Sequence, residues 1–122
     1  MPPLILVVDD EPVIRYILAE ILTDEGYRVR CAEDGRQALD QVAVEVPDLI
    51  VSDIRMPRLH GLDFVARLRA KGHATPVVLI STWAPPPNLP GVRFVRKPFD
   101  LDDITEAVLD GLVEGQAHEQ PV

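Results

Sequence analysis

The chain has 122 residues, the length of one ordinary domain, and its hydrophobic content of 47% excludes a disordered chain. A formal net charge of −8 argues against direct binding of nucleic acid or of an anionic membrane surface, and no apolar run is long enough to cross a bilayer. The single cysteine, Cys31, excludes an internal disulfide and suits a reducing compartment. We therefore expect a cytoplasmic protein in which Cys31 is a small buried hydrophobic residue.

The first half of the chain alternates predicted strands with predicted helices. Residues 4–8 form a continuous apolar run, which is typical of a strand buried on both faces. Pro12 suits the first turn of a helix, and apolar residues then recur at helical spacing until Gly26 ends the pattern. Residues 27–31 alternate as a more exposed strand does, and residues 35–44 predict a second amphipathic helix.

The same alternation continues in the second half of the chain. A strand is predicted to lead from Leu49 to Asp53, followed by a helix that Gly72 ends. Two further strands are predicted at residues 77–80 and 92–95. A last helix carries an apolar stripe, formed by Leu101, Ile104, Val108 and Leu112. We expect the domain to occupy residues 1–114 and residues 115–122 to form a frayed tail.

Strands that alternate with helices predict a doubly wound α/β fold, in which helices cover both faces of a parallel sheet. The segment 82–91 is the exception, because its prolines cannot sustain a regular helix. These prolines are Pro85, Pro86, Pro87 and Pro90. We expect a proline-rich loop there, or at most one helical turn. Trp83 in this loop has two interpretations, a hydrophobic cover for the loop or a contact for a partner.

Polar side chains gather where the predicted strands end. Asp9 and Asp10 end the first strand, Asp53 the third and Ser81 the fourth, and Lys97 follows the fifth. Ligands of open parallel sheets bind at this carboxyl edge. Each residue alone has an ordinary explanation as a helix cap, a loop acid, a turn former or a solvated lysine, but their convergence favours a functional site.

Three neighbouring carboxylates repel one another, so one of them must hold a proton unless a cation neutralises the group. Ligands that are all oxygen atoms favour a hard cation, and Mg²⁺ characteristically takes a few carboxylates and keeps several waters. No histidine or cysteine is placed to favour zinc, and His60, His73 and His118 are interpreted as solvated side chains.

The chain resembles the receiver domains of two-component response regulators from Leu4 to about Leu112. The matching motifs are Val8-Asp9-Asp10-Glu11-Pro12, Asp53-Ile54-Arg55-Met56-Pro57 with Gly61, Ser81, and Lys97-Pro98-Phe99. The resemblance implies the flavodoxin-like fold, a five-stranded parallel sheet in the order 2-1-3-4-5, here with the fourth helix shortened or replaced by the proline-rich loop. It also implies a cis bond between Lys97 and Pro98.

The resemblance assigns a role to each residue of the acidic edge. Asp53 looks like the phosphoacceptor, and Lys97 looks like the ammonium group that pairs with the phosphoryl oxygens. Asp9 and Asp10 look like the Mg²⁺ ligands, together with the Asp53 carboxylate and the backbone carbonyl of Arg55. Ser81 matches the family's switch hydroxyl, and Phe94 matches its switch aromatic ring.

The family resemblance implies a sensor histidine kinase or a phosphotransfer protein as the phosphoryl donor, and an unidentified downstream protein as the receiver of the signal. The proline-rich loop lies where the family's fourth helix contributes to output and dimerisation, so we expect a monomer or a weak dimer. The alternative is a receiver-like interaction module that works without phosphorylation. A phosphatase with an aspartate nucleophile would have an acid where Arg55 stands, and a dinucleotide-binding protein would have a glycine-rich turn after the first strand.

Overall fold

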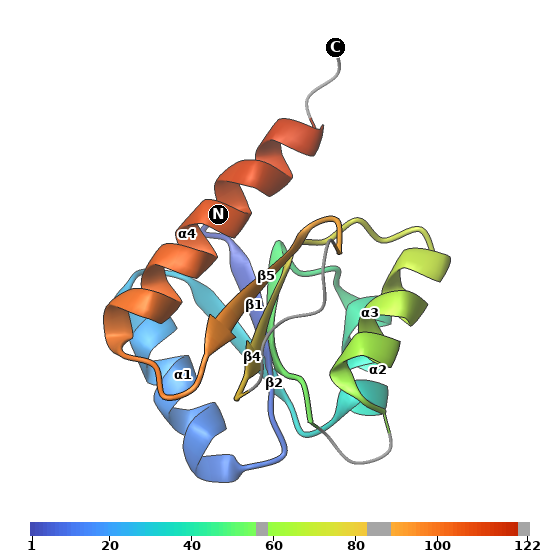
Figure 1. The fold of residues 1–122 in the computed structure, drawn as a ribbon. Coiled ribbons are helices and arrows are strands. Elements are labelled where there is room, and N and C mark those ends of the chain that lie inside the picture. Colours follow the sequence, from blue (N-terminus) through green and yellow to red (C-terminus); the bar gives the residue numbers. More distant parts are fainter. Residues whose placement is uncertain (56–58, 83–88, 120–122) are drawn as a thin grey trace.

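The structure is a computed structural model that describes residues 1–55, 59–82 and 89–119, without the side chains of 116–119. Strands and helices alternate along most of this length (Figure 1). In chain order, they are β1 (Leu4–Val8), α1 (Pro12–Asp24), β2 (Arg28–Ala32), α2 (Gly35–Val44), β3 (Leu49–Asp53), α3 (Gly61–Ala70), β4 (Val77–Ser81), β5 (Val92–Arg96) and α4 (Leu101–Glu119). No helix in the described part of the chain is long and apolar enough to cross a membrane.

The strands form one parallel sheet in the order β2-β1-β3-β4-β5, which confirms the predicted flavodoxin-like topology. Helices α1 and α4 cover one face of the sheet, and α2 and α3 cover the other (Figure 1). Each face has its own apolar cluster. One is built around Leu18 of α1 and Ile104 of α4, and the other around Phe64 and Leu68 of α3.

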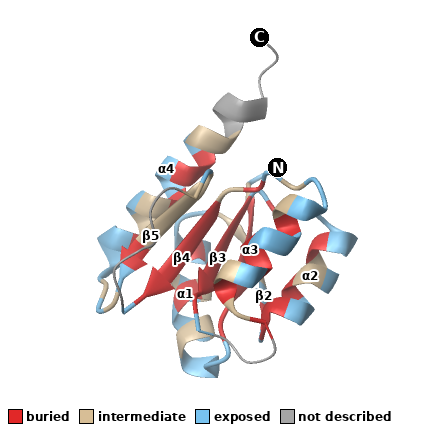
Figure 2. Cartoon of the chain, turned by 45° about the vertical axis from the view of Figure 1, so that its right-hand side comes forward, coloured by how far each residue is buried: buried red, intermediate tan, exposed pale blue. Residues whose placement is uncertain are grey.

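The three inner strands are buried along their whole length, whereas the edge strands β2 and β5 are only half-buried (Figure 2). This difference follows from the order of the sheet, because only an inner strand has a neighbour on both sides and helices over both faces. Asp53 therefore sits at the end of a strand that is held firmly in place on both sides.

The helix ends follow local signals in the sequence. Asp34 caps α2 by accepting a hydrogen bond from the backbone N–H of Gln37 at 2.8 Å. At the start of α4, Asp100 and Asp103 each accept a bond from the other's backbone N–H, at 2.9 and 3.0 Å. The predicted stops are also confirmed, since Gly26 and Gly72 have positive φ angles just after α1 and α3.

Cys31 is exposed, not buried, because it lies near the end of an edge strand where the covering helices leave its side chain open.

Helix α4 continues to Glu119, past the predicted domain end at residue 114. Gly115 does not take the positive φ that stops α1 and α3, and it lies against Pro76 instead. The division into residues 1–114 and 115–122 remains a prediction.

No helix is found in the described residues between β4 and β5, as expected for a shortened or missing fourth helix. Thr82 is an exposed bend, and Pro90 and Gly91 form a turn that leads into β5. Residues 83–88, which include Trp83, lie outside the described part of the structure, as do residues 56–58.

Candidate functional site

The carboxyl ends of four strands bring the predicted site residues to one edge of the sheet. Asp9 and Asp10 follow β1, Asp53 and Ser81 are the last residues of β3 and β4, and Lys97 follows β5. Because all the strands run in the same direction, these residues meet although they are far apart in the sequence.

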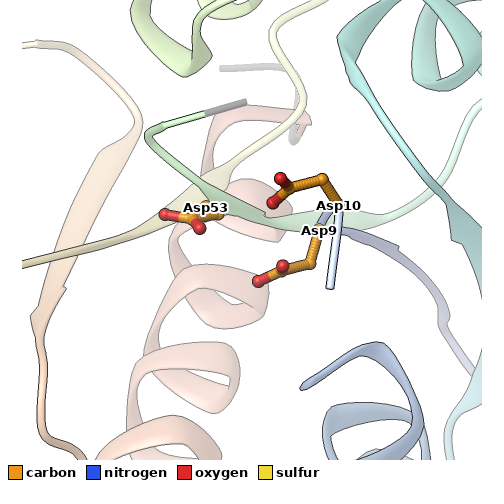
Figure 3. A group of neighbouring side chains, drawn as sticks. All are labelled: Asp9, Asp10 and Asp53. Carbon is orange, nitrogen blue, oxygen red and sulfur yellow. The ribbon is translucent and has the colours of Figure 1, made fainter. Parts of the chain in front are cut away.

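Asp9, Asp10 and Asp53 form an acidic cluster, in which one carboxylate oxygen of each lies within 4.8 Å of the others. In Figure 3 the Asp9 and Asp10 carboxylates point to the side on which Asp53 lies. Asp9 is only 1% exposed and Asp53 only 7%, whereas Asp10 is open to solvent. Two buried carboxylates thus lie beside a third, an arrangement that is unfavourable without a proton or a cation.

Asp9 is the acid of this cluster whose pKa is raised. Its Oδ1 accepts a hydrogen bond from the backbone N–H of Glu11 at 2.9 Å, but its buried Oδ2 has no partner among the described residues. Burial raises the pKa of Asp9 from 3.8 to about 6, and the neighbouring Asp53 and Asp10 charges add to this rise. The Glu11 N–H and the Lys97 ammonium oppose it in part.

Asp53 is held by hydrogen bonds to both of its carboxylate oxygens. The Lys97 ammonium donates to Oδ2 at 3.3 Å, and the backbone N–H of Arg55 donates to Oδ1 at 3.3 Å. The Ser52 hydroxyl donates to the backbone carbonyl of Asp53 at 2.9 Å. Each carboxylate oxygen therefore has a hydrogen-bond donor, which restrains the direction of the side chain.

The residues of the acidic cluster suit a hard divalent cation. All the ligand atoms on offer are oxygens, and the unpartnered buried Oδ2 of Asp9 is an acceptor that a cation would satisfy. A proton on Asp9 would satisfy the same atom, consistent with its raised pKa. The donor set thus fits Mg²⁺ when the acids are ionised.

Gly61 explains one motif of the sequence in physical terms. Its N–H donates to the backbone carbonyl of Ile54 at 2.8 Å, so the start of α3 presses against the end of β3. A Cβ atom at residue 61 would lie 2.8 Å from the Ile54 Cα and 2.9 Å from the Asp53 carbonyl oxygen. Only glycine permits this approach, which supports the backbone that carries Asp53.

The chain matches one known protein family over most of its length. The family model described as a response regulator receiver domain matches residues 5–109. The chain belongs to this family. It is a signalling domain of the kind found in two-component systems, and it is not a classical enzyme.

The relatives of this receiver domain include single domains and longer regulators. It is 34% identical over 110 residues to sporulation initiation phosphotransferase F of Bacillus subtilis, a match that covers 85% of this chain and 89% of that protein. It is 44% identical over 81 residues to response regulator MprA of Mycolicibacterium vanbaalenii, covering 66% of this chain and 35% of MprA. The match thus spans about a third of the MprA regulators, whose whole activity does not transfer to this chain.

Solved structures agree on the fold. Chemotaxis response regulator CheY4 of Vibrio cholerae superposes with a TM-score of 0.81 at 28% identity, covering 91% of this chain and 99% of that one. The signal receiver domain of an HD domain-containing protein from Pseudomonas fluorescens gives a TM-score of 0.86 at 26% identity, with coverages of 99% and 94%.

The predicted switch residues of the receiver domain lie on the neighbouring strands β4 and β5, Ser81 at the end of β4 and Phe94 within β5. Ser81 is 3% exposed, and its backbone carbonyl accepts a bond from the Lys97 N–H at 2.8 Å. Phe94 is half-buried on β5, opposite Leu79 of β4, and packs against the apolar cluster under α2 and α3. The bond between Lys97 and Pro98 is cis, as the resemblance implied.

Two side chains near the receiver site make contacts that the sequence did not predict. His60, expected as a solvated side chain, instead caps α3, with its Nδ1 accepting from the Leu62 N–H at 3.2 Å. Arg15 donates from Nη1 to the Asp9 carbonyl at 2.7 Å. Its place one turn into a helix that starts after the acidic pair was the only available signal for this contact.

Proposed function

We propose that this receiver domain accepts a phosphoryl group on Asp53 and passes the signal on through a change of conformation. The observation that carries the proposal is the setting of Asp53, whose carboxylate is buried, bonded to Lys97 and adjacent to the acidic pair Asp9 and Asp10. A carboxylate is an accepted nucleophile for phosphoryl groups, and such transfer requires mainly positioning and neutralisation of charge.

The proposed reaction is an in-line displacement at phosphorus. An Asp53 carboxylate oxygen forms the new P–O bond while the P–N bond of a phosphohistidine breaks, and the leaving imidazole nitrogen keeps the electron pair. The two hydrogen bonds to Asp53, from Lys97 and from the Arg55 backbone, hold its carboxylate in one direction before the donor arrives. Lys97 then stands ready to pair with a phosphoryl oxygen.

We assign the metal site to the carboxylates of Asp9, Asp10 and Asp53 and to the backbone carbonyl of Arg55. Mg²⁺ bound there would neutralise charge that develops on the transferred group. The buried and unpartnered Asp9 Oδ2 supports this assignment, together with the oxygen-only donor set.

The proposed output starts at Ser81 and Phe94. An acyl phosphate on Asp53 offers acceptor oxygens that the Ser81 hydroxyl can reach by moving toward them, and Phe94 can turn into the space that this movement leaves. Ser81 lies on β4 and Phe94 on the edge strand β5, which has no outer neighbour to hold it. We therefore expect the change to appear first along β4 and β5.

The proposed donor is a sensor histidine kinase or a phosphotransfer protein, and the proposed receiver of the signal is a downstream protein. The match to a phosphotransferase, sporulation initiation phosphotransferase F, supports a role in phosphoryl transfer. A monomer or a weak dimer is expected.

The test is intact-mass spectrometry after incubation with an acyl-phosphate donor or a phosphorylated kinase in the presence of Mg²⁺. Wild type should gain one phosphoryl group that hydroxylamine removes, and Asp53→Asn should stay folded and gain none. Asp48→Asn is the matched control, since Asp48 precedes β3 and bonds the Leu4 N–H away from the cluster. Phosphate on the Asp53 variant, or none on wild type with any donor, would contradict the proposal and leave the phosphorylation-independent module as the explanation.

A further inference from the structure

Three of the four polar groups of Asp9 are held in place by described residues. Its backbone N–H donates to the Ala32 carbonyl at 3.2 Å, and its Oδ1 accepts from the Glu11 N–H at 2.9 Å. Its backbone carbonyl accepts from Nη1 of Arg15 at 2.7 Å, the shortest of the three bonds. Only Oδ2 is left without a described partner, inside the acidic cluster. Of the three groups that hold Asp9, only Arg15 acts through its side chain.

The hydrogen bond from Arg15 also affects the position of Asp10. The carbonyl that it holds belongs to the peptide unit between Asp9 and Asp10, and a peptide unit is planar from one Cα to the next. Rotation about the Cα–C bond of Asp9 would turn this carbonyl and move the Cα of Asp10, and with it the second carboxylate of the cluster. A fixed carbonyl therefore fixes the relative placement of both acids with respect to Asp53.

The placement of Arg15 is not explained by the stability of its helix. It lies one turn into α1, where the positive end of the helix dipole disfavours a cation. Its only acidic partner among the described residues is Glu33, at 4.0 Å, and the Glu33 side chain is 63% exposed, so this ion pair is weak. The Arg15 side chain itself is only 17% exposed and is directed to the loop.

We propose that Arg15 is a positioning residue for the metal site, which holds the Asp9–Asp10 peptide so that both carboxylates face Asp53. The inference rests on the proposed function, because it concerns Mg²⁺ affinity at that site. Partners that orient metal ligands from outside the coordination shell typically change metal affinity by about 10–100-fold when they are removed.

The test compares Mg²⁺ dissociation constants, measured by NMR titration of the backbone amides, in wild type, Arg15→Met and Arg15→Lys. Methionine keeps the apolar stem and removes the donor, so the dissociation constant should rise about tenfold. Lysine keeps the charge and can still donate a hydrogen bond, but it lacks the rigid fork of arginine, so its dissociation constant should fall between the two. Arg28→Met is the matched control, since Arg28 also donates to a backbone carbonyl, that of Pro2, but away from the cluster. The control should bind Mg²⁺ as wild type does.

The direction of the change separates positioning from simple electrostatics. Removal of a positive charge near an acidic site would by itself tighten the binding of a cation, whereas loss of positioning weakens it. Unchanged or tighter binding in Arg15→Met, or equal weakening in Arg28→Met, would overturn the role of Arg15 while the proposed function stands. If wild type itself binds no Mg²⁺, the metal site fails and the role of Arg15 fails with it. Should Arg15→Met not fold, wild-type affinity in Arg15→Lys would still overturn the inference.

Discussion

Replacement of Asp9 by asparagine should stabilise the metal-free domain at neutral pH. Asparagine keeps an oxygen that can accept the hydrogen bond from the Glu11 N–H, but it removes a buried negative charge that faces Asp53 and Asp10. The variant should therefore unfold at a higher temperature than wild type, although it loses a ligand of the proposed metal site.

The pKa of Asp9 gives both the sign and the size of this effect. The pKa is raised from 3.8 to about 6 in the folded state, so the folded protein holds this proton more tightly than the unfolded chain. The ionised group therefore lowers the free energy of unfolding. This destabilisation is complete above about pH 6, becomes smaller as the pH falls, and is absent below about pH 3.8. One pKa unit corresponds to about 1.4 kcal/mol, so the gain from Asp9→Asn has an upper limit of about 3 kcal/mol at neutral pH. For a domain of this size, that corresponds to roughly 10 °C in Tm.

The assay is thermal and urea unfolding of wild type and Asp9→Asn between pH 3.5 and pH 8, in buffer with EDTA. The difference in stability should be largest above pH 6 and should close as the pH falls, and saturating Mg²⁺ should remove it by stabilising wild type. Asp40→Asn, at an exposed position of α2, is the control and should give a small difference that varies little with pH. An Asp9 variant that is less stable than wild type at pH 7.5 in EDTA, or a gap that persists at pH 3.5, would refute the reasoning.

Three further predictions concern the same site. Mg²⁺ at 100 times its dissociation constant should add about 2.7 kcal/mol to the unfolding free energy, and a tenfold loss of affinity in Asp10→Ala would reduce this gain by about 1.4 kcal/mol, as measured by urea unfolding. Lys97→Ala should still accept some phosphate while the NMR shift changes at Ser81 and Phe94 are lost, and a full wild-type pattern of shifts would count against its role. Gly61→Ala should lower the unfolding free energy by about 1–3 kcal/mol, because its Cβ meets backbone atoms that cannot rotate away, and calorimetry would detect this.

The sequence predicted most of the fold because local and long-range signals agreed. Helix α2 has the predicted bounds, and α1 and α3 end beside the glycines expected to stop them. The strand ends shift by about one residue, since an alternating pattern does not say where hydrogen bonding to a neighbour ceases. Gly115 shows the limit of local rules, because a glycine that lies against Pro76 inside a helix looks the same in sequence as one that ends a helix.

The candidate site was predictable in its members but not in its detail. Strand topology alone brings Asp9, Asp53 and Lys97 to one edge, so a correct fold places them together. The hydrogen bond from Arg15 to a backbone carbonyl and the cap formed by His60 depend on side-chain directions that no motif records. The exposure of Cys31 depends on how far the helices extend over an edge strand, which is a property of packing.

The position of Asp53 at the end of an inner strand has a consequence for changes in chain length. Insertion of one residue into β3 would turn every later side chain of the strand to the opposite face and break its ladders with both β1 and β4. The same insertion in β5 would disturb a single ladder, with β4. Insertion scanning should therefore find β3, like the inner strands β1 and β4, less tolerant than the edge strands β2 and β5, so that natural or engineered variation in length would accumulate at the two edges of the sheet.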